Sequence, residues 1–262
     1  MKRFALSEPP NAEGMVHLYE KDYHYLVRVR RLKLGSCFDA LLPGGGEVSI
    51  RVLSTVDNIL IGECSLKQAA LPTPRAAGQA PLRLPPIALF QALAKGAKMD
   101  TIFRQAAESG LALVAPFESA YSTARAAVGK TERWQRIIRE ARQQSGSATE
   151  TAARPPCSFL ELLEYWEAVK KEYRQPVGIL LHQEPLEKGS LHEYIRYNPD
   201  FIALAVGPEG GFSPQEVSLF LAAGFKPLLM GNTILRVETA AVYGIAALRV
   251  ILLERESWML KE

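Results

Sequence analysis

Two glycine-bearing runs in the second half of the chain have the residue types and spacing of a ligand pocket. Residues 207–211 (Gly-Pro-Glu-Gly-Gly) follow an apolar run and precede Ser213, a residue type that caps helices. Residues 231–239 also lie between an apolar run and a helical pattern. Glycine lets backbone approach a ligand closely, and ligands of α/β sheets bind beyond the carboxyl ends of the strands. Two such loops predict one shared pocket, with a tight turn that binds nothing as the alternative.

The order of the glycines bears on the ligand. Residues 207–211 lack the G-x-G-x-x-G order of dinucleotide-binding loops, and no Gly-Lys-Ser/Thr follows them. Nucleotide phosphates are therefore not the expected ligand.

Charged side chains beside the two runs could do chemistry. Arg236 could hold a phosphate or a developing negative charge, or it could pair with Glu238 at a helix start. Glu209 or Glu238 could accept a proton, although Glu is also favourable in the first turn of a helix. His182 ends an apolar run, where it could face a ligand or complete a structural hydrogen bond.

The elements that must position these residues follow an α/β pattern. Apolar runs predict strands, whereas longer amphipathic segments and the capping boxes at Ser158 and Ser213 predict helices. We expect strands over 87–93, 111–115, 177–182, 201–206 and 227–230, and helices over 99–109, 131–144, 158–171 and 237–254.

The first part of the chain has a different pattern, in which short apolar runs are separated by turn residues. Residues 37–42 and 48–53 flank Pro-Gly-Gly-Gly and predict a hairpin, and 59–66 predict another strand. We expect a compact β-barrel over 1–71. Five prolines in 72–86 predict a linker, and 87–262 form a second domain.

The charge of the chain permits an RNA partner. Over 262 residues the net charge is +3. Basic residues gather beside aromatic ones, a combination suited to phosphates and bases, with a solvated strand edge as the alternative. The cluster comprises Tyr23, His24, Tyr25, Arg28, Arg30, Arg31 and Lys33.

The cysteines and the termini argue against several other classes of protein. Cys37, Cys64 and Cys157 are odd in number and widely spaced, so neither a disulfide framework nor a zinc site is expected. The N-terminus lacks an apolar secretion segment, and no run approaches 18 apolar residues. We expect a cytoplasmic protein with no metal and no membrane association.

Five segments together resemble the RsmE family of SPOUT-class ribosomal RNA uridine methyltransferases. The strongest are Val-Gly-Pro-Glu-Gly-Gly-Phe-Ser at 206–213 and Ile-Leu-Arg-Val-Glu-Thr-Ala at 234–240. Segments 94–100, 132–136 and 140–146 are also similar to that family. The resemblance covers most of the chain.

The resemblance implies a trefoil-knotted α/β methyltransferase domain preceded by a small PUA-like β-barrel. Chains rarely thread their own loops, so physical rules alone would not predict a knot. S-adenosylmethionine would bind in a bent form to loops that follow three strands. The implied cofactor-binding residues are His182, Val206, Gly207, Pro208, Glu209, Gly210, Gly211, Met230, Gly231, Ile234, Leu235 and Thr239.

The implied reaction is methylation of N3 of a uridine in small-subunit (16S) ribosomal RNA, with Arg236 and Glu238 as catalytic residues. The implied assembly is a homodimer packed through the C-terminal helix region. In that helix, Ala240, Gly244 and Ala247 form a small-residue face that allows close approach of another element, either from the same chain or from a partner. The expected RNA-binding residues are Arg28, Arg30, Arg31, Lys95 and Lys98, of which the two lysines could equally be solvated flanks of a helix start.

Several positions where members of that family usually carry arginine are neutral here. Residues 120–121, 147–149 and 231–233 read Ala-Tyr, Ser-Ala-Thr and Gly-Asn-Thr. Fewer arginines would change which RNA is held and how tightly. Two further hypotheses are therefore a catalytically altered RNA-binding or ribosome-assembly factor and an α/β enzyme that acts on a small molecule.

Overall fold

The computed structural model describes residues 4–43, 46–66, 84–125, 129–186 and 189–258. The chain forms two compact units, Met1–Gln79 with Arg142–Glu150, and Ala80–Ala141 with Thr151–Glu262. The linker expected over 72–86 lies outside the described residues except for 84–86. Each unit is described in turn below.

The first unit contains a five-stranded sheet in the order β1-β3-β4-β5-β2. The predicted hairpin is confirmed, because β3 and β4 pair antiparallel with Phe38 opposite Ile50. Phe38, Ala40, Val48, Ile50 and Val52 are all buried, which is the period-two pattern of a strand with one face on a core. The strands are β1 (Phe4–Ala5), β2 (Met15–Leu18), β3 (Cys37–Leu41), β4 (Glu47–Ser54) and β5 (Leu60–Leu66).

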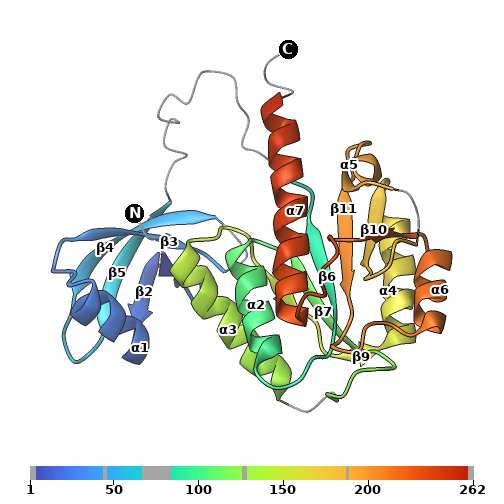
Figure 1. The fold of residues 1–262 in the computed structure, drawn as a ribbon. Helices are drawn as coiled ribbons and strands as arrows, with labels where there is room; N and C mark the ends of the chain where they lie inside the picture. Colours follow the sequence, from blue (N-terminus) through green and yellow to red (C-terminus); the bar gives the residue numbers. More distant parts are fainter. Residues whose placement is uncertain (1–3, 44–45, 67–83, 126–128, 187–188, 259–262) are drawn as a thin grey trace. The chain divides into compact units, whose positions relative to one another are not determined.

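A helical segment between β2 and β3 corrects the sequence interpretation. From the sequence alone, a solvated strand edge is the alternative interpretation of the basic and aromatic cluster. The structure instead has α1 (Glu20–Tyr23) followed by a π-helix, η1 (His24–Val29) (Figure 1). Tyr23 and Leu26 are buried three positions apart and so share one helical face. The segment is too short, and too close to strands, for that spacing to stand out in the sequence.

The second unit is built on a parallel sheet in the order β12-β10-β11-β6-β7-β8, with β9 also paired to β7. Because every pair is parallel, the carboxyl ends of all these strands meet at one edge. The strands are β6 (Ile87–Ala92), β7 (Leu113–Glu118), β8 (Ala152–Ala153), β9 (Cys157–Ser158), β10 (Pro176–Leu181), β11 (Phe201–Val206) and β12 (Phe225–Leu228).

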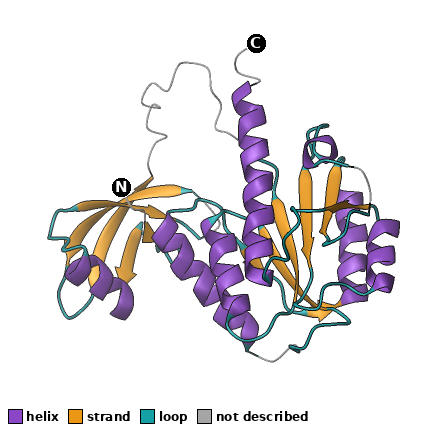
Figure 2. Cartoon of the chain, in the orientation of Figure 1, coloured by secondary structure: helices purple, strands orange, loops and turns teal. Residues whose placement is uncertain are grey.

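Helices cover both faces of this sheet (Figure 2). In β11, Ile202 and Leu204 join the apolar cluster that includes α2 and α7, whereas Ala203 and Ala205 join the cluster that includes α4 and α6. The mixed α/β fold with a parallel sheet is therefore confirmed. The helices are α2 (Lys98–Glu108), α3 (Lys130–Ser145), α4 (Phe159–Glu172), α5 (Leu191–Tyr194), α6 (Pro214–Ala222) and α7 (Val237–Trp258).

One strand lies two residues earlier than predicted. The expected strand 227–230 is β12 (Phe225–Leu228), in which Pro227 is opposite Leu180 of β10. Proline is tolerated there because β12 is the edge of the sheet and one side of it needs no backbone donor. As a result, Leu229 and Met230 belong to the loop that follows the strand.

Close packing of α7 on the sheet explains its small residues. A Cβ added to Gly244 would lie 2.9 Å from a methyl group of Leu204 and 3.1 Å from one of Leu181. At this position the small-residue face serves contact within the chain. No helix among the described residues is long and apolar enough to cross a membrane.

Candidate cofactor pocket

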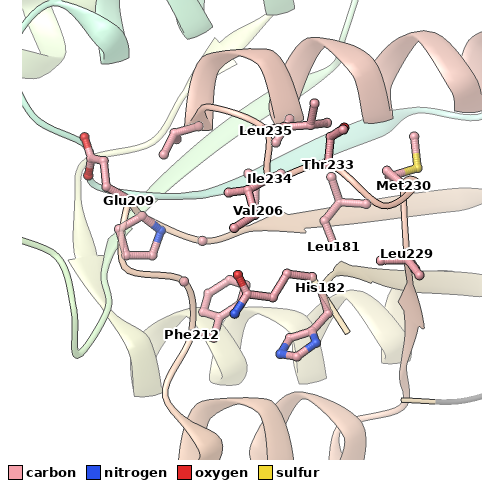
Figure 3. A pocket seen from close by; sticks show the side chains of 17 residues that line it. Leu181, His182, Val206, Glu209, Phe212, Leu229, Met230, Thr233, Ile234 and Leu235 are labelled. Carbon is pink, nitrogen blue, oxygen red and sulfur yellow. The ribbon is translucent and has the colours of Figure 1, made fainter. Parts of the chain in front are cut away.

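Three loops at the carboxyl edge of the parallel sheet line one pocket (Figure 3). They follow β10, β11 and β12, and the start of α7 closes the set. About 800 Å³ of space open to solvent lies between them. The lining residues are Leu181, His182, Gln183, Val206, Gly207, Pro208, Glu209, Gly211, Phe212, Leu229, Met230, Gly231, Thr233, Ile234, Leu235, Val237 and Ala240.

The loop after β11 is a tight turn that only small residues allow. Gly211 donates its N–H to the carbonyl of Pro208 at 2.9 Å and has a φ of 71°, in the left-handed region that favours glycine. A Cβ on Gly207 would lie 3.3 Å from the backbone of Gly211. The turn therefore brings backbone atoms to the pocket wall together with side chains such as that of Glu209.

The end of this loop is anchored by a capping box. Ser213 accepts the Glu216 N–H, and the carboxylate of Glu216 accepts the Ser213 N–H at 2.8 Å. Pro214 at the first helical position lacks an N–H that would have no partner there. The capping box that the sequence predicts at Ser213 is confirmed.

Glu209 connects the glycine loop to the start of α2. Its Oε1 accepts the Lys95 N–H at 3.1 Å and the Lys98 ammonium at 2.7 Å. Partial burial would raise the pKa of Glu209, but the hydrogen bond from Lys98 and those from backbone N–H groups outweigh it and lower the pKa. Glu209 is thus an ionised anchor and a weak proton acceptor.

His182 both lines the pocket and fastens its own loop. Its backbone N–H donates to the carbonyl of Leu228, and its Nδ1 accepts the Glu184 N–H at 3.1 Å. His182 therefore fits both sequence interpretations, since it lines the pocket and its ring also accepts a structural hydrogen bond.

Apolar side chains form most of the wall. Val206, Ile234 and Leu235 group at the centre of Figure 3, and Met230 and Glu209 lie at opposite ends. Ile234 is 87% exposed although it lines the pocket. Such an apolar side chain gains most from a ligand that covers it.

Four of the predicted catalytic and cofactor-binding residues are not in the pocket lining. Gly210 and Thr239 neighbour lining residues in the chain, and Arg236 and Glu238 flank Val237. Within the described part of the chain, Arg236 is exposed and forms no ion pair with Glu238. One carboxylate oxygen of Glu238 is buried without a hydrogen-bond partner.

Seven lining residues are not among the individually predicted cofactor-binding residues, although two of them, Thr233 and Val237, lie within the predicted run 231–239. Leu229 was missed because β12 ends earlier than predicted, and Val237 and Ala240 lie three apart on the first turn of α7, a spacing that could have indicated them. The full set is Leu181, Gln183, Phe212, Leu229, Thr233, Val237 and Ala240.

The predicted RNA-binding residues have different environments. Arg28, Arg31 and Lys95 are exposed, whereas a guanidinium nitrogen of Arg30 is buried without a partner. The ammonium of Lys98 is held by Glu209. Among the residues that the structure describes, no cluster of His, Cys, Asp and Glu could hold a metal ion.

Known proteins match this chain in sequence and in fold. The RNA methyltransferase domain family matches residues 81–249. The ribosomal RNA small subunit methyltransferase E of Synechocystis sp. is 33% identical over 92% of this chain and 74% of its own length. Ribosomal RNA small subunit methyltransferase E 2 of Borreliella burgdorferi is 27% identical over 96% of this chain and 98% of its own.

A solved structure extends the match to three dimensions. The crystal structure of a ribosomal RNA small subunit methyltransferase E from Neisseria gonorrhoeae, bound to S-adenosyl methionine, superposes with a TM-score of 0.76 at 25% identity. The superposition covers 96% of this chain and 98% of that one. The parallel sheet thus lies within an RNA methyltransferase domain. The chain belongs to the ribosomal RNA small subunit methyltransferase E family, as its sequence motifs predicted.

Proposed function

We propose that this chain transfers the methyl group of S-adenosylmethionine to N3 of a uridine in small-subunit ribosomal RNA. The observation that carries the proposal is the pocket formed by the loops after β10, β11 and β12 in a chain of this family. The Neisseria gonorrhoeae relative with the same fold is bound to S-adenosyl methionine.

The residues present fit this cofactor. Apolar side chains such as Leu181, Leu229 and Leu235 offer walls for an adenine ring, and the exposed Ile234 would be covered by it. The turn at 207–211 offers backbone groups for polar atoms of the ligand. Gly210 and Thr239, each next to a lining residue in the chain, would also contact the cofactor.

When bound, the cofactor supplies an electrophilic methyl carbon on a positively charged sulfur. The uridine N3 must lie in line with that carbon and must lose its proton. Arg236 lies between the lining residues Leu235 and Val237, so its guanidinium can stabilise negative charge that develops on the uracil oxygens. The positive end of the α7 dipole acts in the same direction.

Glu238 is the candidate proton acceptor. One carboxylate oxygen of Glu238 has no hydrogen-bond partner, whereas Oε1 of Glu209 accepts hydrogen bonds from both Lys95 and Lys98. Glu209 instead holds the cofactor loop in place.

The first unit would bind RNA. We assign residues 1–71 to a PUA-like barrel that contacts ribosomal RNA through Arg28, Arg30 and Arg31, and 72–86 to a linker. Residues 87–262 would form the knotted methyltransferase domain. The knot is proposed from the membership of this chain in the methyltransferase family.

The protein would act as a homodimer on the small ribosomal subunit. Support for a second copy comes from α7, where Tyr243, Val250 and Leu253 are 54%, 52% and 40% exposed. Apolar side chains repeated along one helix are what an interface between helices buries.

Two measurements test this function. Calorimetry with purified protein should show binding of S-adenosylmethionine, and ribosomal RNA from cells that lack the gene should lose a single N3-methyluridine. Binding with unchanged RNA would eliminate the proposed target. Failure to bind the cofactor would favour an RNA-binding factor without catalysis.

A further inference from the structure

A tyrosine beside the glycine loop has no role in the pocket described above. Tyr121 follows β7, so it lies at the same carboxyl edge of the parallel sheet as the pocket loops. A Cβ added to Gly210 would lie 3.0 Å from the Tyr121 Cβ. Gly210 stands between Glu209 and Gly211, which both line the pocket. The Tyr121 side chain is nevertheless 49% exposed.

The backbone that carries Tyr121 is firmly held. Residues 119–122 form a turn closed by the Ser122 N–H, which donates to the Ser119 carbonyl at 2.9 Å, and by the Ser119 N–H, which donates to Ser122 Oγ at 3.1 Å. The buried Glu216 accepts the Ala120 N–H at 2.8 Å and also caps α6. The same carboxylate therefore fixes the Tyr121 turn and the end of the glycine loop.

A rigid turn that presents an aromatic ring to solvent suits the recognition of a flat ligand. Burial of the ring does not explain the arrangement, since about half of the side chain stays exposed. Nucleobases that are drawn out of a stack bind to aromatic side chains by stacking, at about 1–3 kcal/mol per base. Enzymes that modify a base act on single strands or draw the base out of its stack into the active site.

We propose that Tyr121 stacks on the nucleobase that receives the methyl group and so holds it beside the cofactor loop. This inference rests on the proposed function. Stacking uses the ring and not the hydroxyl, so phenylalanine and tryptophan should replace Tyr121, whereas alanine and leucine should not.

Steady-state kinetics with ribosomal RNA tests the proposal. Tyr121→Ala and Tyr121→Leu should lower kcat/KM for RNA by about 5- to 150-fold, the equivalent of about 1–3 kcal/mol, with most of the change in the KM for RNA. Tyr121→Phe should stay within about threefold of the unsubstituted protein, and all variants should bind S-adenosylmethionine with unchanged affinity.

A matched control is available in the same unit. Tyr197 is 70% exposed and precedes β11, so it lies toward the opposite edge of the sheet. Tyr197→Ala should leave kcat/KM unchanged. If Tyr121→Leu matches the unsubstituted protein, or if Tyr121→Ala loses affinity for the cofactor, the stacking role is wrong.

A spectroscopic readout separates stacking from a merely structural effect. The tryptophan introduced in Tyr121→Trp should be quenched by a uridine-containing fragment of ribosomal RNA. The unsubstituted protein, whose tryptophans are Trp134, Trp166 and Trp258, should show no such quenching and serves as the control. If Tyr121→Trp is active but its fluorescence is not quenched, the stacking role of Tyr121 is wrong while the proposed function stands. If the unsubstituted protein methylates no ribosomal RNA, the proposed function fails first.

Discussion

Breaking the contact between Glu209 and Lys98 should loosen the cofactor loop by a measurable amount. Both side chains are about a third exposed, so the about 1.5–3 kcal/mol of a charge-assisted hydrogen bond is reduced by solvent to about 1 kcal/mol. Glu209→Gln and Lys98→Met should therefore each raise the Kd for S-adenosylmethionine about fivefold. Isothermal titration calorimetry measures this directly.

The double variant gives the sharper result. If the two side chains act through each other, Glu209→Gln with Lys98→Met should weaken binding by about fivefold and not by the about 25-fold that independent effects would give. Additive losses would refute the coupling, and an unchanged Kd in Lys98→Met would refute the anchor itself.

The pH dependence has a definite sign. The pKa of Glu209 is lowered in the folded protein from its ordinary 4.5, so the carboxylate contributes stability at pH values above 4.5. This contribution is lost as the pH falls through the lowered pKa. Urea unfolding across that acid range should show the loss in the unsubstituted protein and a smaller one in Glu209→Gln.

Three further substitutions test other parts of the site and fold. Arg236→Ala should abolish methyl transfer while it leaves the Kd for S-adenosylmethionine within about tenfold, and surviving turnover would show that Arg236 has another role. Gly211→Val places a β-branched residue at a φ of 71° and should weaken cofactor binding at least tenfold, whereas Gly35→Val, at a φ of 78° in the first unit, should leave binding unchanged. Gly244→Leu should lower the free energy of unfolding by about 1–3 kcal/mol in urea, because its Cβ would lie 2.9 Å from Leu204; an unchanged midpoint would mean that α7 can move away from the sheet.

Much of the pocket could be predicted because its signals are local. The glycine loop follows directly on β11, and Ser213 and Glu216 are three residues apart, so both features are visible in a short window of sequence. The alternation of strands and helices likewise predicted the parallel sheet. Each of these features depends on residues that are neighbours in the chain.

The features that sequence reasoning missed depend on contacts between distant residues. Lys98 and Glu209 are 111 positions apart, and Tyr121, in the turn after β7, lies beside Gly210 in the loop after β11. The hydrophobic periodicity of the sequence does not indicate such pairs, because the contacts arise only when the strand order brings β6, β7 and β11 together. The helical segment after β2 was missed for a different reason, since two short turns of helix are too brief to display a period.

Methyl transfer by the purified protein tests the central claim most directly. Small ribosomal subunits and free ribosomal RNA from cells that lack the gene would be incubated with S-adenosylmethionine that carries a labelled methyl group, then digested and analysed by mass spectrometry. The label should appear in N3-methyluridine at one position, and Arg236→Ala should give none. Label in any other nucleoside, or no label from a protein that binds the cofactor, would contradict the account.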